Sequence, residues 1–481
     1  MADVDGATLA AMAALAAAAN RGDDTIDERL EALGWVNVTD RLDIAAGRIE
    51  DGEFTRSNAA GFVAYDEDTR TLAIVFEGSL HVEEIGDARG ALADYRDATV
   101  RQERHYELLQ PLIDAGLALA EESPDDLPVE RVLVTGHSLG GAMAEQFALR
   151  HTDAPGLVID VASFGSPGVD FDGEPGPLAG RLVRIEHTGD AVTRLGEVPR
   201  LELERAGQII EIDLPLIGDT GIGDGSLDFQ GFLDVLSNQE HGPALYRTTG
   251  EAVFGSELFD QRSGNEVIRA IIDSDSDGDL KDYRWLDGSD EDEFLVGFAG
   301  DDRLGGGEGD DLIDGGAGDD RLHGGPGNDL LAGNDGSDRL RGEDGDDVLY
   351  AGGGTRNYLY GGDGADTLVS GTGIDRMWGG EGEDRFVLTA AGTPGPTNLI
   401  YDWEEGEILD FSGIEGASRF TISEPFARSG SSGPATDVRV VVRDDGGTAV
   451  SNLILVDLGL DHDANVARLS ESILLPESLA F

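Results

Sequence analysis

The sequence predicts an α/β domain followed by an all-β domain of short repeated turns, with a β cap at the C-terminal end. Two patterns indicate this: an apolar β-branched run leads into a helical segment around residue 138, and a Gly- and Asp-rich nonapeptide repeats from residue 297. The composition also changes, from ordinary globular to Gly- and Asp-rich. The expected boundaries are 1–260 for the α/β domain, 261–287 for an acidic linker, 288–388 for the repeats and 389–481 for the cap.

The composition excludes several classes of function. The chain has 481 residues, a formal net charge of −63 and no cysteine. Such a surface repels nucleic acids and anionic lipid headgroups at long range, so no nucleic-acid partner is expected. The absence of cysteine rules out disulfides, thiolate–zinc sites and cysteine nucleophiles. Two explanations of the acidity stay open: the carboxylates are cation ligands, or the surface is adapted to salt.

The N-terminal segment "MADVDGATLAAMAALAAAANRGDD" is rich in alanine and has no basic residues at its start. This favours an amphipathic helix over a signal peptide. No apolar run reaches the ~18 residues that span a bilayer, so no transmembrane segment is expected.

The segment "VLVTGHSLGGAMA" has the sequence context of a nucleophile elbow. A short apolar strand precedes Ser138 and a helical pattern follows it, while Gly136 and Gly140 allow the strand and helix to approach closely. A Gly-x-Ser-x-Gly motif can arise by chance in a chain with 70 glycines. This one lies outside the Gly-rich half and between the expected elements, so Ser138 is the candidate nucleophile.

A serine nucleophile needs a base, and the base needs an orienting acid. Downstream of Ser138 the first domain offers His151, His187 and His241. In α/β-hydrolase order the acid precedes the histidine. Asp190 follows an expected strand end, and only His241 comes after it. Weaker acid candidates are Asp160, inside a strand, and Asp170 and Asp172, on a loop.

An oxyanion hole needs backbone donors. The N–H of Leu139, directly after the nucleophile, is one candidate. The apolar strand Leu72–Phe76 ends in Gly78-Ser79, so the N–H of Ser79 is the natural second donor.

Together these residues resemble the class 3 lipases, the fungal-lipase-like α/β-hydrolases. The resemblance covers about residues 59–246 and rests on "AIVFEGSL", "DYRDA", "VLVTGHSLGGAMA", "ASFGSPGV", "RIEHTGDAVTRL" and "EHGPALY" in that order. It implies Ser138 as nucleophile, Asp190 as acid and His241 as base, with Ser79 and Leu139 forming the oxyanion hole. The family usually has Arg before the oxyanion Gly-Ser or Gly-Thr, whereas this chain has Glu77.

The second half repeats a nonapeptide of the form "GGAGDDRLH". The sixth position aims a carboxylate at a shared cation, and the eighth position holds an apolar residue that points inward. Calcium suits such a site because it accepts six to eight oxygen ligands. The expected calcium ligands are the sixth-position residues Asp302, Asp311, Asp320, Asp329, Asp338, Asp347, Asn357, Asp366, Asp375 and Asp384.

The alternative reading of the repeats is a disordered acidic linker. A linker has no reason to keep an apolar residue at every eighth position, so we expect an ordered structure. Without calcium the carboxylates repel one another and the apolar content is too low for folding. Disorder is therefore expected without calcium, and order at the ~0.1–1 mM level of extracellular modules.

These blocks resemble the RTX proteins of Gram-negative bacteria over about 100 residues. The resemblance implies a parallel β-roll, extracellular location and export by type I secretion machinery through an uncleaved C-terminal signal. The segment "NLIYDWEEGEILDFSGI" looks like the segment that caps RTX rolls, and the apolar, acid-dotted residues 451–481 fit the signal.

A further calcium site is possible just before the repeats. Asp273, Asp275 and Asp277 with Gly278 match the first half of an EF-hand loop. Position twelve is Arg284 instead of the bidentate Glu, so either a looser calcium site or a plain acidic linker is expected.

The function these features predict is a secreted, calcium-dependent carboxylic ester hydrolase, with a lipid or ester of the triacylglycerol type as substrate. Two alternatives stay open: a phospholipase A1 with the same triad, and a non-catalytic calcium-binding exoprotein that carries a relic hydrolase domain.

Overall fold

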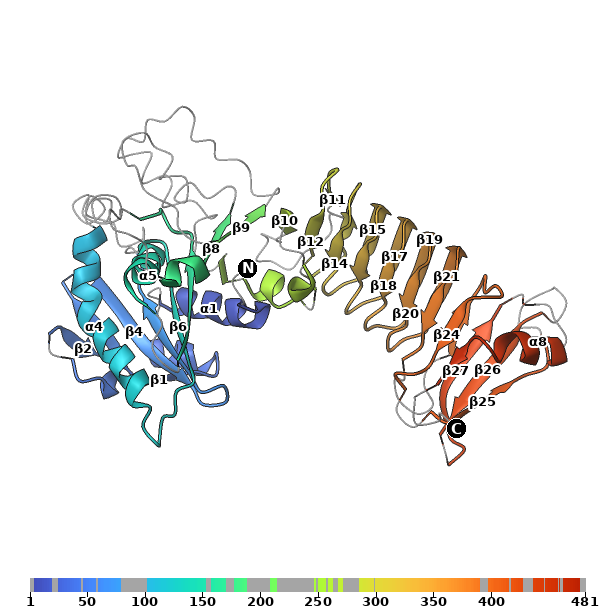
Figure 1. Ribbon diagram of the computed structural model, residues 1–481, viewed down its shortest axis with the longest axis horizontal. Helices are drawn as coiled ribbons and strands as arrows, with labels where there is room; N and C mark the ends of the chain where they lie inside the picture. Colours follow the sequence, from blue (N-terminus) through green and yellow to red (C-terminus); the bar gives the residue numbers. More distant parts are fainter. Residues whose placement is uncertain are drawn as a thin grey trace. The chain divides into compact units, whose positions relative to one another are not determined.

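The computed structural model divides the chain into two compact units, Met1–Asp260 and Gln261–Phe481 (Figure 1), each of which is described by itself. It describes residues 4–19, 25–44, 46–57, 59–78, 102–152, 157–169, 177–187, 208–213, 246–247, 250–256, 258–262, 267–270, 285–297, 299–389, 397–414, 417–426, 436–444, 446–456, 458 and 462–475.

The first unit is built on a mixed sheet. From β5 to β9 each strand pairs in parallel with the next in chain order, while β2, β3, β4 and β5 form an antiparallel meander and β1 pairs with β4. The central strands are buried on both faces, as expected for parallel strands covered by helices. The strands are β1 (Val36–Asn37), β2 (Arg48–Glu50), β3 (Glu53–Arg56), β4 (Ala59–Asp66), β5 (Thr71–Phe76), β6 (Arg131–His137), β7 (Val158–Phe164), β8 (Leu182–His187) and β9 (Gln208–Asp213).

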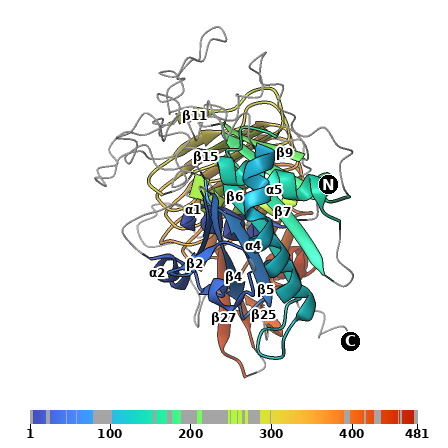
Figure 2. The same cartoon turned by 90° about the vertical axis from the view of Figure 1, so that its left-hand side faces the viewer.

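Helices cover both faces of this sheet. Val132 and Val134 of β6 pack into one core with α4 (Gln102–Glu122) and α5 (Leu139–Arg150), which Figure 2 shows near the same strands. Side chains alternate along a strand, so Arg131 and Thr135 face the other side. There their side chains donate hydrogen bonds to α1 (Gly6–Ala18). The remaining helices are α2 (Ile26–Glu31), η1 (Thr39–Arg41), η3 (Pro177–Arg181), η6 (Gly250–Phe254) and η7 (Phe259–Gln261).

The expected N-terminal helix is present, but the expectation that it is amphipathic is wrong. Asp5 caps α1 by accepting a hydrogen bond from the N–H of Thr8 at 2.8 Å, and buried residues lie on almost every side of the helix. The helix is buried on these sides because η6 packs on α1. The two elements approach so closely that a Cβ on Gly250 would lie 2.5 Å from the Cβ of Ala13. The alanines permit this approach because they add little volume.

The second unit contains a parallel β-roll. Successive repeats alternate between two sheets, so that hydrogen-bonded strands are two repeats apart, as in the pairs Leu304–Leu322 and Ile313–Leu331. One sheet contains β10 (Val267–Ala270), β12 (Glu293–Val296), β14 (Leu312–Asp314), β16 (Leu330–Ala332), β18 (Val348–Tyr350), β20 (Thr367–Val369), β22 (Arg385–Val387) and β24 (Ile408–Asp410). The other contains β11 (Trp285–Asp287), β13 (Arg303–Gly305), β15 (Arg321–Pro326), β17 (Arg339–Asp344), β19 (Tyr358–Asp363), β21 (Arg376–Glu381) and β23 (Thr397–Ile400).

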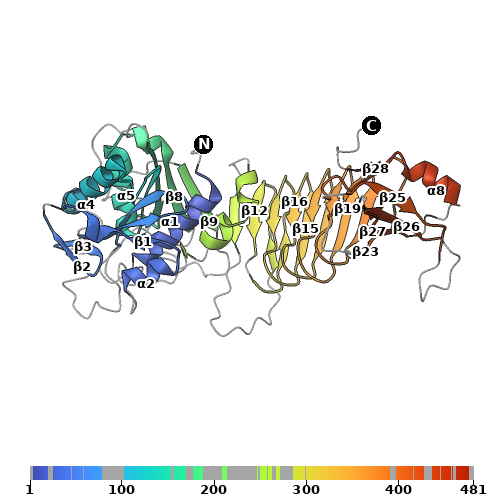
Figure 3. The same ribbon diagram turned by 90° about the horizontal axis from the view of Figure 1, so that it is seen from below.

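An apolar column fills the roll between the two sheets, whose successive strands are visible in Figure 3. The eighth-position side chain of every repeat from Leu304 to Phe386 is fully buried, which confirms the expectation that these residues point inward. Burial of each such side chain stabilises the fold by roughly 1.5–3 kcal/mol. The single residue that interrupts the repeat, Ala351, is also buried in this core.

The C-terminal segment closes the end of the column. β27 pairs in parallel with β23 and forms an antiparallel sheet with β26 and β25, while β28 pairs with β24. Phe411, Val440 and Leu453 belong to the same core as the repeats. The elements are β25 (Arg419–Ile422), β26 (Val438–Arg443), β27 (Ala449–Leu455), α8 (His462–Leu469) and β28 (Ile473–Leu474).

Candidate active site and metal sites

Ser138 lies at a sharp turn between β6 and α5. Its backbone has φ 57° and ψ −122°, a combination that costs a non-glycine residue about 1–3 kcal/mol. The turn is held because the Ser138 N–H donates to the carbonyl of Phe164 at 2.8 Å, and the Ala142 N–H donates to the carbonyl of Ser138 at 3.1 Å. A strained serine at the carboxyl end of a central parallel strand is the geometry of a nucleophile elbow.

Two glycines make this turn sterically possible. A Cβ on Gly140 would lie 2.2 Å from the carbonyl oxygen of Phe76, and a Cβ on Gly136 would lie 2.5 Å from the carbonyl of Gly140. Neither contact can be relieved by moving a flexible side chain. The elbow therefore needs glycine at both positions, as the sequence motif indicated.

The end of β5 passes directly against the elbow. A Cβ on Gly78 would lie 2.7 Å from the carbonyl oxygen of His137 and 3.5 Å from the Cβ of Ser138. The Glu77 N–H donates to the carbonyl of Ala60 at 3.0 Å, a backbone contact that holds this strand end. Leu139 is the first residue of α5, where a helix leaves its N–H groups without intrahelical acceptors.

Tyr246 joins the ends of β6 and β8. Its ring stacks on His187 with a centroid separation of 3.8 Å and lies 5.3 Å from the ring of His137. Its hydroxyl also accepts a hydrogen bond from the His187 N–H at 3.1 Å. Sequence reasoning missed this residue, although it is the last letter of the motif "EHGPALY".

The other candidates in the first domain are occupied elsewhere. Asp160 lies in the middle of β7 and accepts from Arg131 at 2.6 Å and Arg181 at 3.3 Å. His151 follows the last residue of α5, at the opposite end of the helix from Ser138, and stacks on Phe147 with centroids 4.1 Å apart.

A buried ion cluster beneath the elbow helix was also missed by sequence reasoning. Arg184 is fully buried and donates to Glu145 at 2.7 Å and to Glu186 at 2.6 Å, while Ser163 donates to Glu145 at 2.9 Å. Burial raises the pKa of Glu145, with Arg184 acting in the opposite direction. The cluster ties α5 to β7 and β8, which are the elements around the serine.

In the roll, the sixth-position carboxylates form hydrogen-bonded ladders. Oδ1 of Asp329 accepts from the N–H of Asp311 at 2.9 Å, and the same contact recurs along the roll. The second oxygen, Oδ2, is buried without a hydrogen-bond partner in seven of these residues: Asp311, Asp320, Asp329, Asp338, Asp347, Asp366 and Asp384. Buried carboxylate oxygens without a hydrogen-bond donor are suited to bind a cation.

The surroundings of these oxygens fit calcium. A Cβ on Gly324 would lie 2.0 Å from Oδ2 of Asp329 and 2.8 Å from the carbonyl oxygen of Gly342, so carboxylate and carbonyl oxygens converge there. Among the residues that the structure describes, no group of three or more His, Cys, Asp or Glu side chains could hold a metal ion. Backbone carbonyl oxygens such as that of Gly342 can supply further ligands at these turns, and calcium accepts such ligands.

Two of the expected ligands differ from the rest. Asn357 donates from Nδ2 to the carbonyl of Gly353 at 3.0 Å and to Oδ1 of Asp375 at 3.1 Å. Oδ2 of Asp375 accepts from the Gly371 N–H at 2.8 Å. Both side chains are thus satisfied by the protein, in the turns that follow the inserted Ala351.

Two sequence families match the parts of the chain that carry these features. Residues 107–198 match the class 3 lipase family. Residues 287–322, 296–331, 323–356 and 360–390 match the RTX calcium-binding nonapeptide repeat. The chain combines a class 3 lipase domain with RTX repeats.

A solved structure agrees with the fold of both parts. The extracellular lipase LipA from Serratia marcescens is 16% identical, with 98% of each chain covered and a TM-score of 0.51. The Lip2 lipase from Yarrowia lipolytica is 19% identical over 50% of this chain and 91% of its own, with a TM-score of 0.29 that is too low for a comparison of folds. The predicted fold, a lipase-like domain followed by a parallel β-roll, is confirmed, and the matches support a lipase-type hydrolase.

Several predicted site residues lie outside the described part of the chain. In the lipase domain these are Ser79, Asp170, Asp172, Asp190 and His241, and before the RTX repeats they are Asp273, Asp275 and Asp277. Within the described residues, no helix is both long and apolar enough to cross a membrane.

The RTX carboxylates also predict a pH dependence of the calcium-free roll. Burial, together with the charge of neighbouring carboxylates, raises the pKa of Asp329 to about 8 and that of Asp347 to about 6. In the unfolded chain an Asp has a pKa of about 3.9, so the folded roll binds more protons. Its stability is therefore present at low pH and lost as the pH rises through about 6 to about 8.

Circular dichroism of the protein in excess chelator, followed over this range, measures the effect. We expect β signal at the acidic end and its loss at the alkaline end, whereas a calcium-saturated control keeps its signal throughout. A calcium-free β signal that grows as the pH rises would contradict the prediction.

Proposed function

We propose that this protein is a secreted, calcium-dependent carboxylic ester hydrolase of the lipase type. Ser138 attacks the ester carbonyl while His241 accepts the hydroxyl proton, and Asp190 orients the imidazole and stabilises its charged form. The backbone N–H groups of Leu139 and Ser79 stabilise the oxyanion of the tetrahedral intermediate. His241 then protonates the leaving alcohol, and water hydrolyses the acyl-enzyme by the same steps.

The observation that carries this proposal is the position of Tyr246. It contacts His137, directly before the nucleophile, and His187, three residues before Asp190. Tyr246 itself follows His241 by five residues. One aromatic ring therefore fixes three chain segments, each of which carries one member of the triad within a few residues.

The close approach of Gly78 supports the oxyanion hole. The chain leaves β5 against the Cβ of Ser138, and Ser79 is the next residue. The residue that follows Gly78 in the chain is therefore the one we propose as the second oxyanion donor. The contact of the Glu77 N–H with Ala60 offers a backbone substitute for the arginine that the family usually has there.

We propose that calcium is structural and binds at the RTX turns. The seven carboxylates with an orphaned Oδ2 are the strongest candidates, and Asp302 belongs to the same ladder. The internal contacts of Asn357 and Asp375 favour a turn that is held without its own ion. A looser site at Asp273, Asp275 and Asp277 stays part of the proposal. Bound calcium would neutralise buried carboxylates and link neighbouring turns.

The proposed location is extracellular, with export by type I secretion machinery that acts on the C-terminal segment. A fold that requires calcium suits this route, because the chain would stay unfolded at low calcium and order outside the cell. The Serratia lipase with which this chain shares its fold is described as extracellular, which is consistent with this proposal.

Labelling with a fluorophosphonate, followed by peptide mapping, tests the proposal directly. We expect one modified peptide that contains Ser138, because only a serine with a working base reacts rapidly. Hydrolysis of p-nitrophenyl butyrate and laurate should accompany the labelling. No label at Ser138 in calcium-saturated protein that is folded by circular dichroism would overturn the proposed function and favour a non-catalytic calcium-binding protein.

Tyr246 gives a second prediction. Tyr246→Ala removes the ring between His137 and His187, and kcat is expected to fall by on the order of 10²-fold, since small misplacements of catalytic groups have this effect. Tyr246→Phe keeps the stacking and loses the hydrogen bond from the His187 N–H, so kcat should fall by less than about tenfold. Steady-state kinetics with p-nitrophenyl butyrate distinguishes the two. Equal kcat values for Tyr246→Ala and wild type would show that the ring does not position the triad.

A further inference from the structure

The outer face of one roll sheet carries a chemistry unlike the rest of the chain. From β13 to β23 the seventh and ninth repeat positions point away from the buried eighth position. We call these outward residues the arginine–aromatic face. They are Arg303, Arg321, Arg339, Tyr358, Arg376 and Leu399 at the seventh position or its equivalent, and Gly305, His323, Arg341, Tyr360, Trp378 and Tyr401 at the ninth.

The other sheet shows that this composition is not a general feature of the roll. Its corresponding positions from β14 to β22 are more aliphatic and carry a single arginine: Leu312, Leu330, Val348, Thr367 and Arg385 at the seventh, and Asp314, Ala332, Tyr350, Val369 and Val387 at the ninth. The chain as a whole has a net charge of −63, yet no Asp or Glu occupies a seventh or ninth position of the arginine–aromatic face. The arginine–aromatic face therefore carries positive charge without any carboxylate at its seventh and ninth positions, although most of the charged residues in the chain are acidic.

Planar groups on neighbouring strands stack along this face in two columns. In the first, Tyr358 lies between the guanidinium groups of Arg339, 5.5 Å from its ring centroid, and Arg376, at 5.3 Å. Arg376 also donates to the Tyr358 hydroxyl at 3.3 Å. These contacts hold the guanidinium groups in fixed orientations, so little side-chain entropy is lost when they bind a ligand.

The second column begins with Arg341, whose guanidinium lies 5.5 Å from the ring centroid of Tyr360. Tyr360 stacks on Trp378 at 4.6 Å, and Trp378 stacks on Tyr401 at 4.3 Å, with interplanar angles of 11° and 10°. This spacing matches the roughly 4.8 Å between neighbouring strands. The stacked rings cover one another's faces, and all three side chains are partly exposed.

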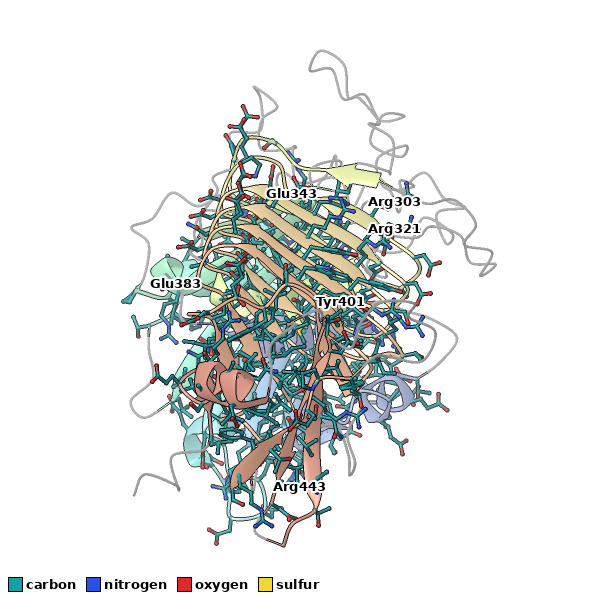
Figure 4. The ribbon with its side chains drawn as sticks, turned by 90° about the vertical axis from the view of Figure 1, so that its right-hand side faces the viewer. Arg303, Arg321, Glu343, Glu383, Tyr401 and Arg443 are labelled. Atoms are coloured by element: carbon teal, nitrogen blue, oxygen red, sulfur yellow. The ribbon has the colours of Figure 1, made fainter. Side chains whose placement is uncertain are left out.

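Carboxylates border the face. His323 pairs with Glu343 at 3.2 Å, and Asp344, Asp363 and Glu381 occupy equivalent positions near the far ends of the same strands. Figure 4 shows Arg303 and Arg321 next to each other on one side of the roll, with Glu343 away from them. The cationic region is therefore a strip that follows the roll axis.

We propose that the arginine–aromatic face binds a linear acidic polysaccharide, with its carboxylates on the arginines and its hydroxyl groups on the edges of the ring column. A guanidinium forms paired hydrogen bonds with a carboxylate, and the arginines recur in steps of the strand spacing. A single extended chain that carries anions at regular intervals fits such a strip. This inference does not depend on the proposed hydrolase activity.

Two other polyanions fit the strip less well. A flat anionic membrane would meet the acidic border as well as the arginines, and like charges repel. Single-stranded nucleic acid binds mainly by stacking bases on free aromatic faces. Here Trp378 has a ring on each side, so those faces are occupied.

The test uses calcium-saturated, full-length protein and hyaluronan oligosaccharides, in which a glucuronate alternates with a neutral sugar. Binding is measured by isothermal titration calorimetry at low and high salt. We expect binding that weakens as salt rises. Arg339→Gln/Arg341→Gln should weaken it by at least about tenfold, since each arginine contributes charge-assisted hydrogen bonds. Arg341→Gln alone should have a smaller effect.

The matched control is Arg439→Gln/Arg443→Gln on β26, which changes the net charge equally and also removes an arginine over an aromatic ring, that of Phe426. It should bind as wild type does. The proposal is overturned if both double variants weaken binding equally, if hyaluronan does not bind, or if the Arg339/Arg341 variant loses binding only to single-stranded RNA or to anionic vesicles. Circular dichroism in calcium verifies that each variant keeps the roll.

Discussion

Replacing Ser138 with alanine is expected to lower kcat for p-nitrophenyl butyrate by on the order of 10⁵-fold. The loss is large because the proposed triad acts as a unit, so that His241 and Asp190 have no nucleophile to activate once the hydroxyl is gone. The fold should survive, since the backbone N–H and carbonyl of residue 138 make the contacts to Phe164 and Ala142. Alanine also tolerates a φ of 57° about as poorly as serine, so the strain changes little.

A matched control separates the loss of the nucleophile from general damage. Ser163→Ala removes another buried hydroxyl close to α5, one that donates to Glu145, and should lower stability by about 1 kcal/mol with kcat within about tenfold of wild type. Thermal melts and steady-state rates are measured for both variants. A Ser138→Ala enzyme that hydrolyses the ester as fast as wild type would end the hydrolase proposal.

Much of this architecture follows from local patterns in the sequence. The eighth position is apolar in every repeat from Leu304 to Phe386, and burial of that column specifies the roll. The elbow could be predicted because its requirements are local: an apolar strand, a helix, and two glycines where any Cβ would collide with backbone. Both features depend on residues that are neighbours in the sequence or recur at a fixed period.

Features that depend on long-range contacts were not predictable in this way. Tyr246 has no periodic context, and its role comes from two strand ends that lie about 60 and 110 residues earlier in the chain. The burial of α1 depends on η6, more than 200 residues later. The arginine–aromatic face has a period of two repeats, because alternate turns belong to different sheets, and a nine-residue alignment conceals it.

Removal of calcium is expected to abolish the β structure of the RTX repeats at alkaline pH while the lipase domain keeps its fold. In the calcium-free roll seven buried carboxylates each carry an oxygen without a partner, and ionisation of several of them along one ladder is unfavourable. The apolar column offers one buried side chain per repeat, and this burial cannot offset the cost of burying several ionised carboxylates. The core of the lipase domain is a separate cluster of residues, so it does not depend on the roll.

Circular dichroism and limited proteolysis after chelation measure the loss of the roll and the survival of the lipase domain. Cleavage sites should appear in residues 288–388 after chelation and disappear when calcium returns to about 1 mM. Little proton release should accompany this refolding near pH 7, because the Asp side chains of the unfolded repeats, with a pKa of about 3.9, are already ionised and calcium requires the ionised carboxylates. A spectrum that is unchanged by exhaustive chelation would show that packing alone holds the roll.

A pair of conservative variants attributes the effect to the sixth position. Asp329→Asn replaces the oxygen that has no partner with an amide nitrogen, as at Asn357, and should raise the calcium concentration needed for folding by at least about tenfold. Asp310→Asn removes the same charge from an exposed fifth-position residue whose Oδ1 accepts from the Asn328 N–H, and an asparagine oxygen can still accept that bond. Its calcium midpoint should stay within about threefold of wild type, as expected for a screened surface charge. Equal shifts for the two variants would mean that overall charge, and not coordination at the buried ladder, sets the calcium requirement.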